Sequence, residues 1–145
     1  MSFLFYILLL TNLTADYHPP VKFSTFSLNN LKDVHPDLVR LANAVLIKYP
    51  EYDIVVLDGL RDLETQKRYV EKGVSKTLNS KHLRQDDGYS HAIDIKPATY
   101  KWTEPIYKWR LFAQHVKDTA DELGISILSG GLEWGWDYPH FQLGD

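Results

Sequence analysis

The segment Ala92-Ile93-Asp94-Ile95-Lys96 decides the fold class, because its apolar and polar residues alternate as they do in a half-buried β-strand. Side chains along a strand point in turn to its two faces. One face of this strand therefore carries Ile93 and Ile95, which we expect to face a core, and the other carries Asp94. A carboxylate on the polar face of a rigid strand is well placed to bind a ligand.

Segments on both sides of this strand predict the elements that pack with it. Short β-branched or alternating runs predict further strands at residues 54–57, 125–128 and 140–143. Apolar residues at helical spacing, bounded by proline, aspartate and glycine, predict helices at residues 36–49, 62–72 and 105–123. The sequence thus predicts an α+β fold, with a small, mostly antiparallel sheet and helices packed against one side of it.

Composition restricts the classes of function. The chain has 145 residues, of which 44% are hydrophobic and 24% are charged, as expected for one globular domain. It contains no cysteine, so disulfides and thiolate metal ligands are excluded. The formal net charge is -3, and no basic stripe or glycine-rich phosphate loop is present, so we expect no nucleic-acid partner.

Residues 1–20 are predicted to form an extension separate from a domain over residues 21–145. Phe3 to Leu10 are eight consecutive apolar residues, too few for the roughly 20 that span a bilayer, so we expect no membrane span. The run fits the apolar region of a secretory signal with Ala15 at a weak cleavage site, although no Lys or Arg precedes it. An extra strand or a tail is the alternative.

Two histidines and an aspartate form the main candidate site. His82, Asp94 and His140 would supply two imidazoles and one carboxylate, the number of protein ligands that a catalytic zinc ion takes while water holds its fourth position. Asp94 and His140 lie on predicted strands, whereas His82 lies in a long polar loop over residues 74–91. His91 is the alternative ligand, although on a continued strand it would point away from Asp94.

Further polar residues near these positions are candidates for the chemistry. Asp137 stands three residues before His140 and could act as general base; Glu133, beside a tryptophan, competes for that role because partial burial could raise its pKa. Arg61 has several fixed donors for a carboxylate or a developing oxyanion. Its alternative role is an ion pair with a neighbouring aspartate.

Aromatic residues cluster around the glycine-rich turn before the last predicted strand. Trp134 and Trp136 flank this turn, and Tyr138 follows it. All three could line a substrate groove, since binding grooves are rich in aromatic side chains.

The ordered motifs resemble a known group of enzymes. Ser80-Lys81-His82, Gly88, Ala92-Ile93-Asp94 and His140-Phe141 resemble the pattern of zinc peptidases that share a fold with D-Ala-D-Ala carboxypeptidases, D-Ala-D-Ala dipeptidases and the hedgehog amino-terminal domain. Within this group the chain is similar to the phage-type L-alanyl-D-glutamate peptidases, many of which are endolysins. The resemblance covers residue 23 to the end of the chain.

The resemblance implies a role for each matching residue. It implies that His82, Asp94 and His140 bind Zn²⁺, that Asp137 is the general base, and that Arg61 polarises the substrate carbonyl. Ser80, His91, Trp134, Trp136 and Tyr138 are the expected substrate-binding residues. The interval between His82 and Asp94 is longer than in the family pattern, with Arg84 to Ser90 resembling an insertion, and this keeps His91 open as the third ligand.

The expected function is zinc-dependent cleavage of the peptidoglycan stem peptide at the L-Ala–D-Glu bond, as in a phage endolysin. The alternatives are a D-Ala-D-Ala carboxypeptidase or dipeptidase, and a non-catalytic zinc-containing module that binds the cell wall. We expect a monomer that is made in the host cytoplasm and acts at the bacterial cell wall, with export through residues 1–15 left open.

Overall fold

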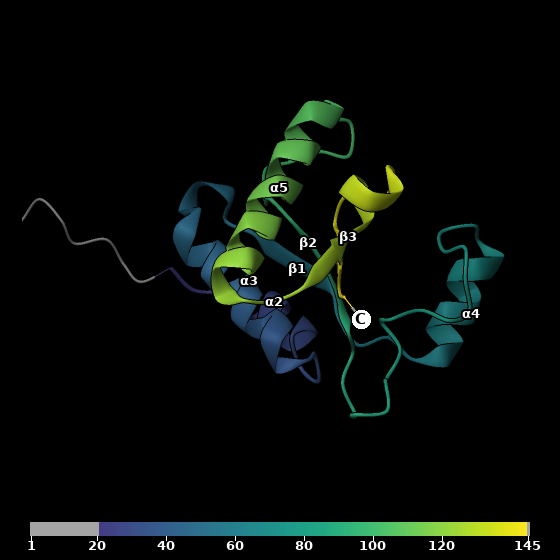
Figure 1. Ribbon diagram of the computed structural model, residues 1–145. Helices are drawn as coiled ribbons and strands as arrows, with labels where there is room; N and C mark the ends of the chain where they lie inside the picture. The colour runs from purple at the N-terminus through teal and green to yellow at the C-terminus, as the bar shows by residue number, and fades with distance from the viewer. Residues whose placement is uncertain (1–20, 145) are drawn as a thin grey trace, which may run out of the picture.

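Four strands form one antiparallel sheet in the order β1-β2-β4-β3. These are β1 (Val55–Asp58), β2 (Ala92–Lys96), β4 (His140–Leu143) and β3 (Ile127–Ser129). The computed structural model in Figure 1 describes residues 21–144, so the expectations for residues 1–20 lie outside the described residues. The predicted α+β class is confirmed, and all three strand pairs are antiparallel.

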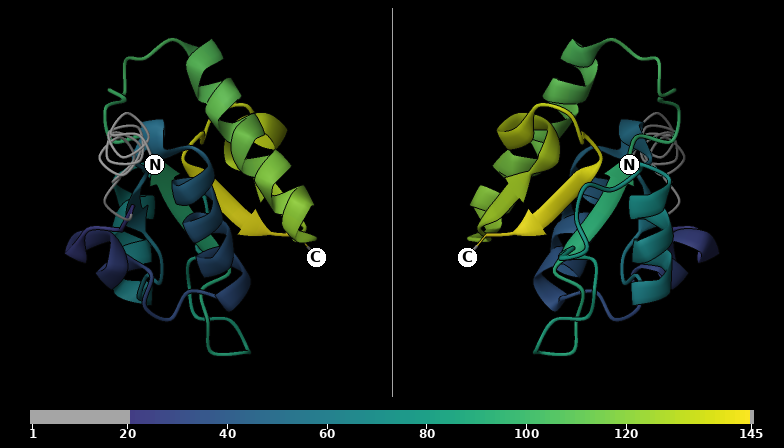
Figure 2. Two further views of the ribbon diagram at one scale, coloured as in Figure 1. Left: turned by 90° about the vertical axis from the view of Figure 1, so that its left-hand side faces the viewer. Right: turned by 90° about the vertical axis from the view of Figure 1, so that its right-hand side faces the viewer.

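Helices α3 (Pro36–Lys48) and α5 (Ile106–Leu123) cover one face of the sheet, as the two views of Figure 2 show. Helix α4 (Leu63–Glu71) lies on the other side, next to the long loop that leads into β2 (Figure 1). The remaining elements are α2 (Thr25–Asn30), a 3-10 turn at Pro50–Tyr52 and a π-helical turn, η2, at Gly130–Trp134. No helix within residues 21–144 is long and apolar enough to cross a membrane.

The core lies between the sheet and the α3–α5 layer. Ile93 and Ile95 of β2 are fully buried there with Phe141 of β4 and Phe112 of α5. Burial of such side chains stabilises a fold by about 1.5–3 kcal/mol each. Asp94, between the two isoleucines, keeps 21% of its side chain exposed and faces the opposite side, as the alternation of β2 predicts.

Local capping explains where the predicted helices begin and end. His35 caps α3 by accepting the Asp37 backbone N–H at its Nδ1 (3.1 Å), and Pro36 takes the first helical position. The Asp62 carboxylate caps α4 by accepting the Thr65 N–H (2.7 Å). Helix α5 ends at Leu123 and is capped by Gly124, whose φ of 70° lies in the left-handed region.

Helix α2, which the apolar pattern did not predict, covers the outer edge of β1. The Ser27 hydroxyl accepts the Val56 N–H (3.0 Å), and the Asn30 side chain donates to the Val56 carbonyl (2.9 Å). These bonds satisfy strand groups that would otherwise be unpaired at a sheet edge. Gly59, directly after β1, packs beneath this helix: a Cβ there would lie 2.1 Å from the Asn30 carbonyl oxygen and 2.6 Å from Val34 Cγ2.

The loop over residues 74–91 contains no regular element but is held by backbone hydrogen bonds. Ser90 donates its N–H to the Asp33 carbonyl (2.8 Å) and accepts the His35 N–H (2.9 Å). At the other end, the Arg61 N–H donates to the His82 carbonyl (2.9 Å), and the His91 N–H to the Lys81 carbonyl (2.9 Å). The loop that carries His82 is therefore fixed to α3, β2 and the end of β1.

Candidate metal centre

Strand register brings two of the candidate ligands side by side. Asp94 of β2 pairs with His140 of β4 on one side and with Asp58 of β1 on the other. The loop then places His82 above the same point of the sheet, where its side chain is almost fully buried. Residues far apart in the sequence thus meet on the face of the sheet that α3 and α5 leave uncovered.

Three potential ligand atoms converge at this point. His82 Nε2 lies 3.1 Å from Asp94 Oδ1 and 3.2 Å from His140 Nδ1, and His140 Nδ1 lies 3.2 Å from Asp94 Oδ1. A tetrahedral zinc ion with ligand bonds of about 2.0–2.1 Å separates its ligands by about 3.3–3.4 Å. The observed triangle is only slightly smaller, so these atoms match one triangular face of such a site.

The outer nitrogen of each ring has its own hydrogen-bond acceptor. His82 Nδ1 lies 2.8 Å from the Gly59 carbonyl oxygen, which accepts only, so this nitrogen carries a proton. His140 Nε2 donates to Gln142 Oε1 (2.9 Å). In neutral rings the inner nitrogens then hold lone pairs, and these face a carboxylate oxygen with no proton between them. A cation at the centre removes this repulsion, which is the arrangement of a metal-binding histidine and its outer acceptor. Burial alone would lower the pKa of His140, but its bond to Asp94 raises it above the usual value, so a proton on this ring also offsets the repulsion.

Asp137 lies beside these three residues and lines a cleft of about 570 Å³. Burial raises the pKa of its carboxyl, and the negative charge of Asp94 raises it further. A carboxylate with a raised pKa is a better proton acceptor, as a general base requires.

Glu133, the competing base, is engaged elsewhere. It forms an ion pair with Lys117 and accepts the Ser129 N–H (2.6 Å). Burial alone would raise its pKa, but these hydrogen bonds lower it below the usual value. The expected rise in the pKa of Glu133 is therefore wrong, because the carboxylate has gained a cationic partner. It also does not line the cleft.

Arg61 is buried and forms part of a network at the wall of the cleft. Its Nε donates to Asp58 Oδ2 (2.9 Å), its Nη1 donates to Gln66 Oε1 (2.7 Å), and its Nη2 also bonds to Asp58. Nη2 lies 3.8 Å from Asp94 Oδ2. The alternative role as an ion pair with a neighbouring aspartate thus coexists with a position at the candidate centre.

Sequence reasoning overlooked the part that Gln66 plays in holding Arg61. Gln66 is fully buried on α4 and also donates to Ser75 Oγ (2.9 Å) and to the Thr77 carbonyl (2.6 Å). It joins Arg61 to the loop that lines the cleft. Gln66 is among the positions that match the resembling family, but the resemblance implies no role for it.

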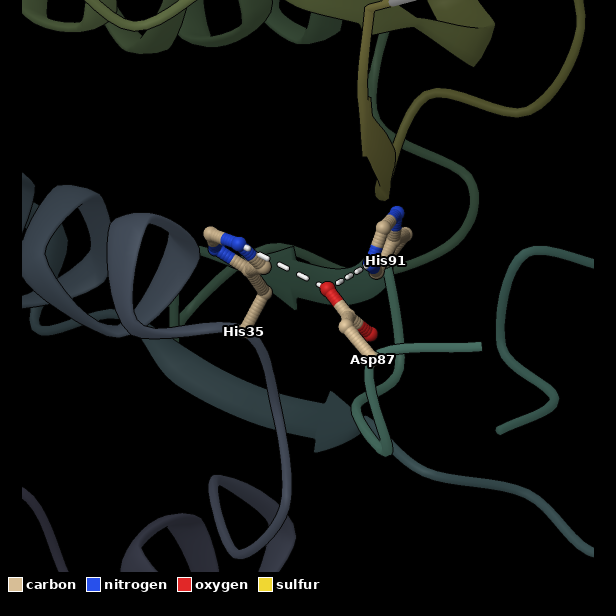
Figure 3. A group of neighbouring side chains, drawn as sticks. All are labelled: His35, Asp87 and His91. Carbon is tan, nitrogen blue, oxygen red and sulfur yellow. Dashed lines mark hydrogen bonds and ion pairs between the residues drawn. The ribbon is translucent and has the colours of Figure 1, made fainter. Parts of the chain in front are cut away.

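His91 belongs to a different group, shown in Figure 3. His91 Nε2 lies 2.7 Å from Asp87 Oδ2, and His35 Nε2 lies 3.8 Å from the same oxygen. Because His35 Nδ1 accepts the Asp37 N–H, the neutral His35 ring carries its proton on Nε2 and points it at the carboxylate. Both rings can therefore donate to Asp87, and the charge of this group is satisfied without a cation.

The remaining expected substrate-binding residues occupy different positions. Ser80, Trp134 and Trp136 line the same cleft as the three candidate ligands, and Trp134 stacks on the His140 ring with 5.1 Å between centroids. Tyr138 lines an adjoining hollow, whereas His91 lines neither.

Comparison with known proteins identifies relatives of this chain. Residues 20–140 match the family model described as phage L-alanyl-D-glutamate peptidase. The crystal structure of the Serratia marcescens L-Ala D-Glu endopeptidase ChiX is similar, with a TM-score of 0.65 and 34% sequence identity, and the match covers 84% of this chain and 89% of that one. No match was found among curated proteins.

Proposed function

Because this chain belongs to the phage L-alanyl-D-glutamate peptidase family, we propose that it hydrolyses the L-Ala–D-Glu bond of the peptidoglycan stem peptide with one zinc ion. The convergence of His82 Nε2, Asp94 Oδ1 and His140 Nδ1 within 3.1–3.2 Å carries the proposal. Two imidazoles and a carboxylate suit zinc among the transition metals, and the chain has no thiolate that would compete.

The bound ion would supply a Lewis acid that acidifies water and polarises the scissile carbonyl. Asp137 takes one proton from the attacking water at its carboxylate and delivers it to the peptide nitrogen as the C–N bond breaks. The products are the carboxyl group of L-Ala and the free amine of D-Glu, so the carboxylate of Asp137 is regenerated.

Arg61 stabilises the negative charge that develops on the carbonyl oxygen. A guanidinium has five N–H donors, and three of them are used in the bonds to Asp58 and Gln66. Because Arg61 lines the cleft, its remaining donors are available to the substrate. Removing one such donor typically slows an enzyme on the order of 10²–10³-fold.

Digestion of purified peptidoglycan tests the bond and the metal together. Mass spectrometry should find new L-Ala carboxyl ends and D-Glu amino ends. Chelation should abolish them, and added zinc should restore them. Release of D-Ala alone would instead identify a carboxypeptidase, and binding to the wall without any cleavage would identify a non-catalytic module. The site of action that follows from the proposed function is the bacterial cell wall.

Zinc content separates the ligands from the neighbouring histidines. Wild type should bind one zinc ion per chain, His82→Ala should lose it, and His91→Ala should retain it. Loss of zinc only in His91→Ala would transfer the third ligand position to that residue.

A further inference from the structure

A second hollow of about 520 Å³ adjoins the cleft that holds the candidate centre. The two hollows share Leu57, Asp94, Trp136 and Asp137. A substrate whose scissile bond lies at Asp137 therefore extends in two directions. We call the hollow that contains Lys76 the basic arm and the hollow that contains Trp102 the aromatic arm.

The basic arm is suited to a carboxylate. The Lys76 ammonium lies 4.3 Å from the centroid of the Trp136 ring, and within residues 21–144 it forms no ion pair with a carboxylate. Arg61 and Lys81 line the same arm. Its negative groups, Asp58, Asp94 and Asp137, lie at the centre or pair with Arg61, so the exposed Lys76 ammonium can receive the carboxylate of a ligand.

Apart from Asp94 and Asp137, which it shares with the centre, the aromatic arm has no unpaired charged side chain among the described residues that line it. Lys96 Nζ lies 5.9 Å from the centroid of the Trp102 ring but does not line the arm. Glu104, which lines it, pairs with Lys108 (3.2 Å), and the Tyr138 hydroxyl accepts a hydrogen bond from Arg110 Nε (3.3 Å). What remains is an apolar wall that includes Trp102, Ile106 and Tyr138. Uncharged ligands with an apolar face fit such a wall.

Trp102 forms a flat platform in this arm. The residue is 67% exposed, yet its ring stacks on the buried Trp109 with an interplanar angle of 8° and 5.7 Å between centroids. Lys96 Nζ fixes the preceding turn by donating to the Pro97 (2.9 Å) and Tyr100 (2.8 Å) carbonyls. A large aromatic surface that is exposed but held in place marks a binding site better than a mobile one does.

From this asymmetry we infer the direction in which the substrate lies. The D-Glu side, with its free carboxylate, occupies the basic arm near Lys76, and the muramic acid sugar that precedes L-Ala stacks its apolar C–H face on Trp102 in the aromatic arm. This inference rests on the proposed function and adds to it a sugar-binding subsite and a polarity for the peptide.

Two ratios of kcat/KM test the assignment. The sugar ratio compares the stem tetrapeptide carrying N-acetylmuramic acid with the free tetrapeptide. The carboxylate ratio compares the free tetrapeptide with its analogue in which the D-Glu α-carboxyl is amidated. We expect both ratios to exceed one in wild type, by about 3- to 10-fold for the sugar ratio, the range of one aromatic contact.

Each variant should change one ratio. Trp102→Ala should bring the sugar ratio close to one, Trp102→Phe should retain most of it, and Lys76→Gln should bring the carboxylate ratio close to one. Tyr107→Ala and Lys67→Gln are matched controls, because both side chains are exposed and line neither arm. They should keep both wild-type ratios.

The outcomes separate the inference from the proposed function. A wild-type enzyme that cleaves both peptides with a sugar ratio of one, or a Trp102→Ala variant that keeps the wild-type ratio, overturns the sugar subsite. A Lys76→Gln variant with an unchanged carboxylate ratio overturns the polarity. If wild type loaded with zinc cleaves none of these substrates, the proposed function itself fails.

Discussion

Gly59→Ala should weaken metal binding although residue 59 bears no ligand. The new Cβ would lie 2.1 Å from the Asn30 carbonyl oxygen and 2.6 Å from Val34 Cγ2, so α2 and the chain after β1 must move apart. The carbonyl that accepts the proton of His82 Nδ1 belongs to this residue and moves with it. We expect a loss of about 1–3 kcal/mol in the free energy of unfolding from overpacking.

The effect on the metal should be separable from the effect on stability. Changing the outer acceptor of a metal-bound histidine costs about 10–100-fold in affinity, equivalent to about 1.4–2.7 kcal/mol. Zinc affinity is measured by competition with a chromogenic chelator, and stability by urea unfolding of the metal-free proteins. Both measurements use the full chain at the same pH and salt concentration.

Gly124→Ala provides a matched control. This substitution also adds a Cβ, but no atom lies within 4 Å of the new group, and Gly124 has a φ of 70°. The left-handed conformation should cost alanine about 1–2 kcal/mol, without any effect on zinc affinity. A Gly59→Ala protein with wild-type affinity and reduced stability would refute the argument that this carbonyl orients His82.

Three further predictions concern the residues around the centre. Gln142→Leu removes the acceptor of His140 Nε2–H and should lower zinc affinity about 10–100-fold in the same competition assay; an unchanged affinity contradicts this. Arg61→Ala leaves Asp58 and Gln66 without their partner and should destabilise the protein by about 2–4 kcal/mol in urea unfolding. Arg61→Lys should lose less stability but should still hydrolyse the substrate slowly. Equal stabilities of wild type and Arg61→Ala would show that the network contributes nothing to stability. Since burial raises the pKa of Asp137 and only the ionised form accepts a proton, kcat/KM should fall toward acid from above the usual aspartate pKa of about 3.9; a fall only below that value argues against Asp137 as the base.

The elements that depend on local patterns could be predicted from the sequence. The alternation in residues 92–96 is enough to identify β2 and the face of Asp94, because a period of two needs no knowledge of the neighbouring strands. The strand predicted at residues 125–128 begins later, at Ile127, because the Ile125 N–H still bonds to the Ala120 carbonyl (2.9 Å) at the end of α5. The boundary of an element shifts by one or two residues when a hydrogen bond from the preceding helix includes the residues at its start.

The features that depend on distant contacts could not be predicted. Helix α2 has six residues, too few to show a helical period, and it is held by bonds to β1 that lie 26 to 29 residues away in sequence. The candidate ligands could be named from their residue types, but their shared position follows from the pairing of Asp94 with His140. The carbonyl of Gly59 has no signature, since every residue has a carbonyl. Metal binding itself stays a prediction.

The two imidazoles of the candidate centre differ in how readily evolution can alter their support. His140 relies on the side chain of Gln142, which a single codon change can shorten, charge or remove. His82 relies on a peptide carbonyl, which no side-chain change can remove, although a residue other than glycine at position 59 would displace it through contact with Asn30. Natural drift and laboratory selection can therefore retune the His140 half in small steps, whereas the His82 half changes only when the backbone takes a new path.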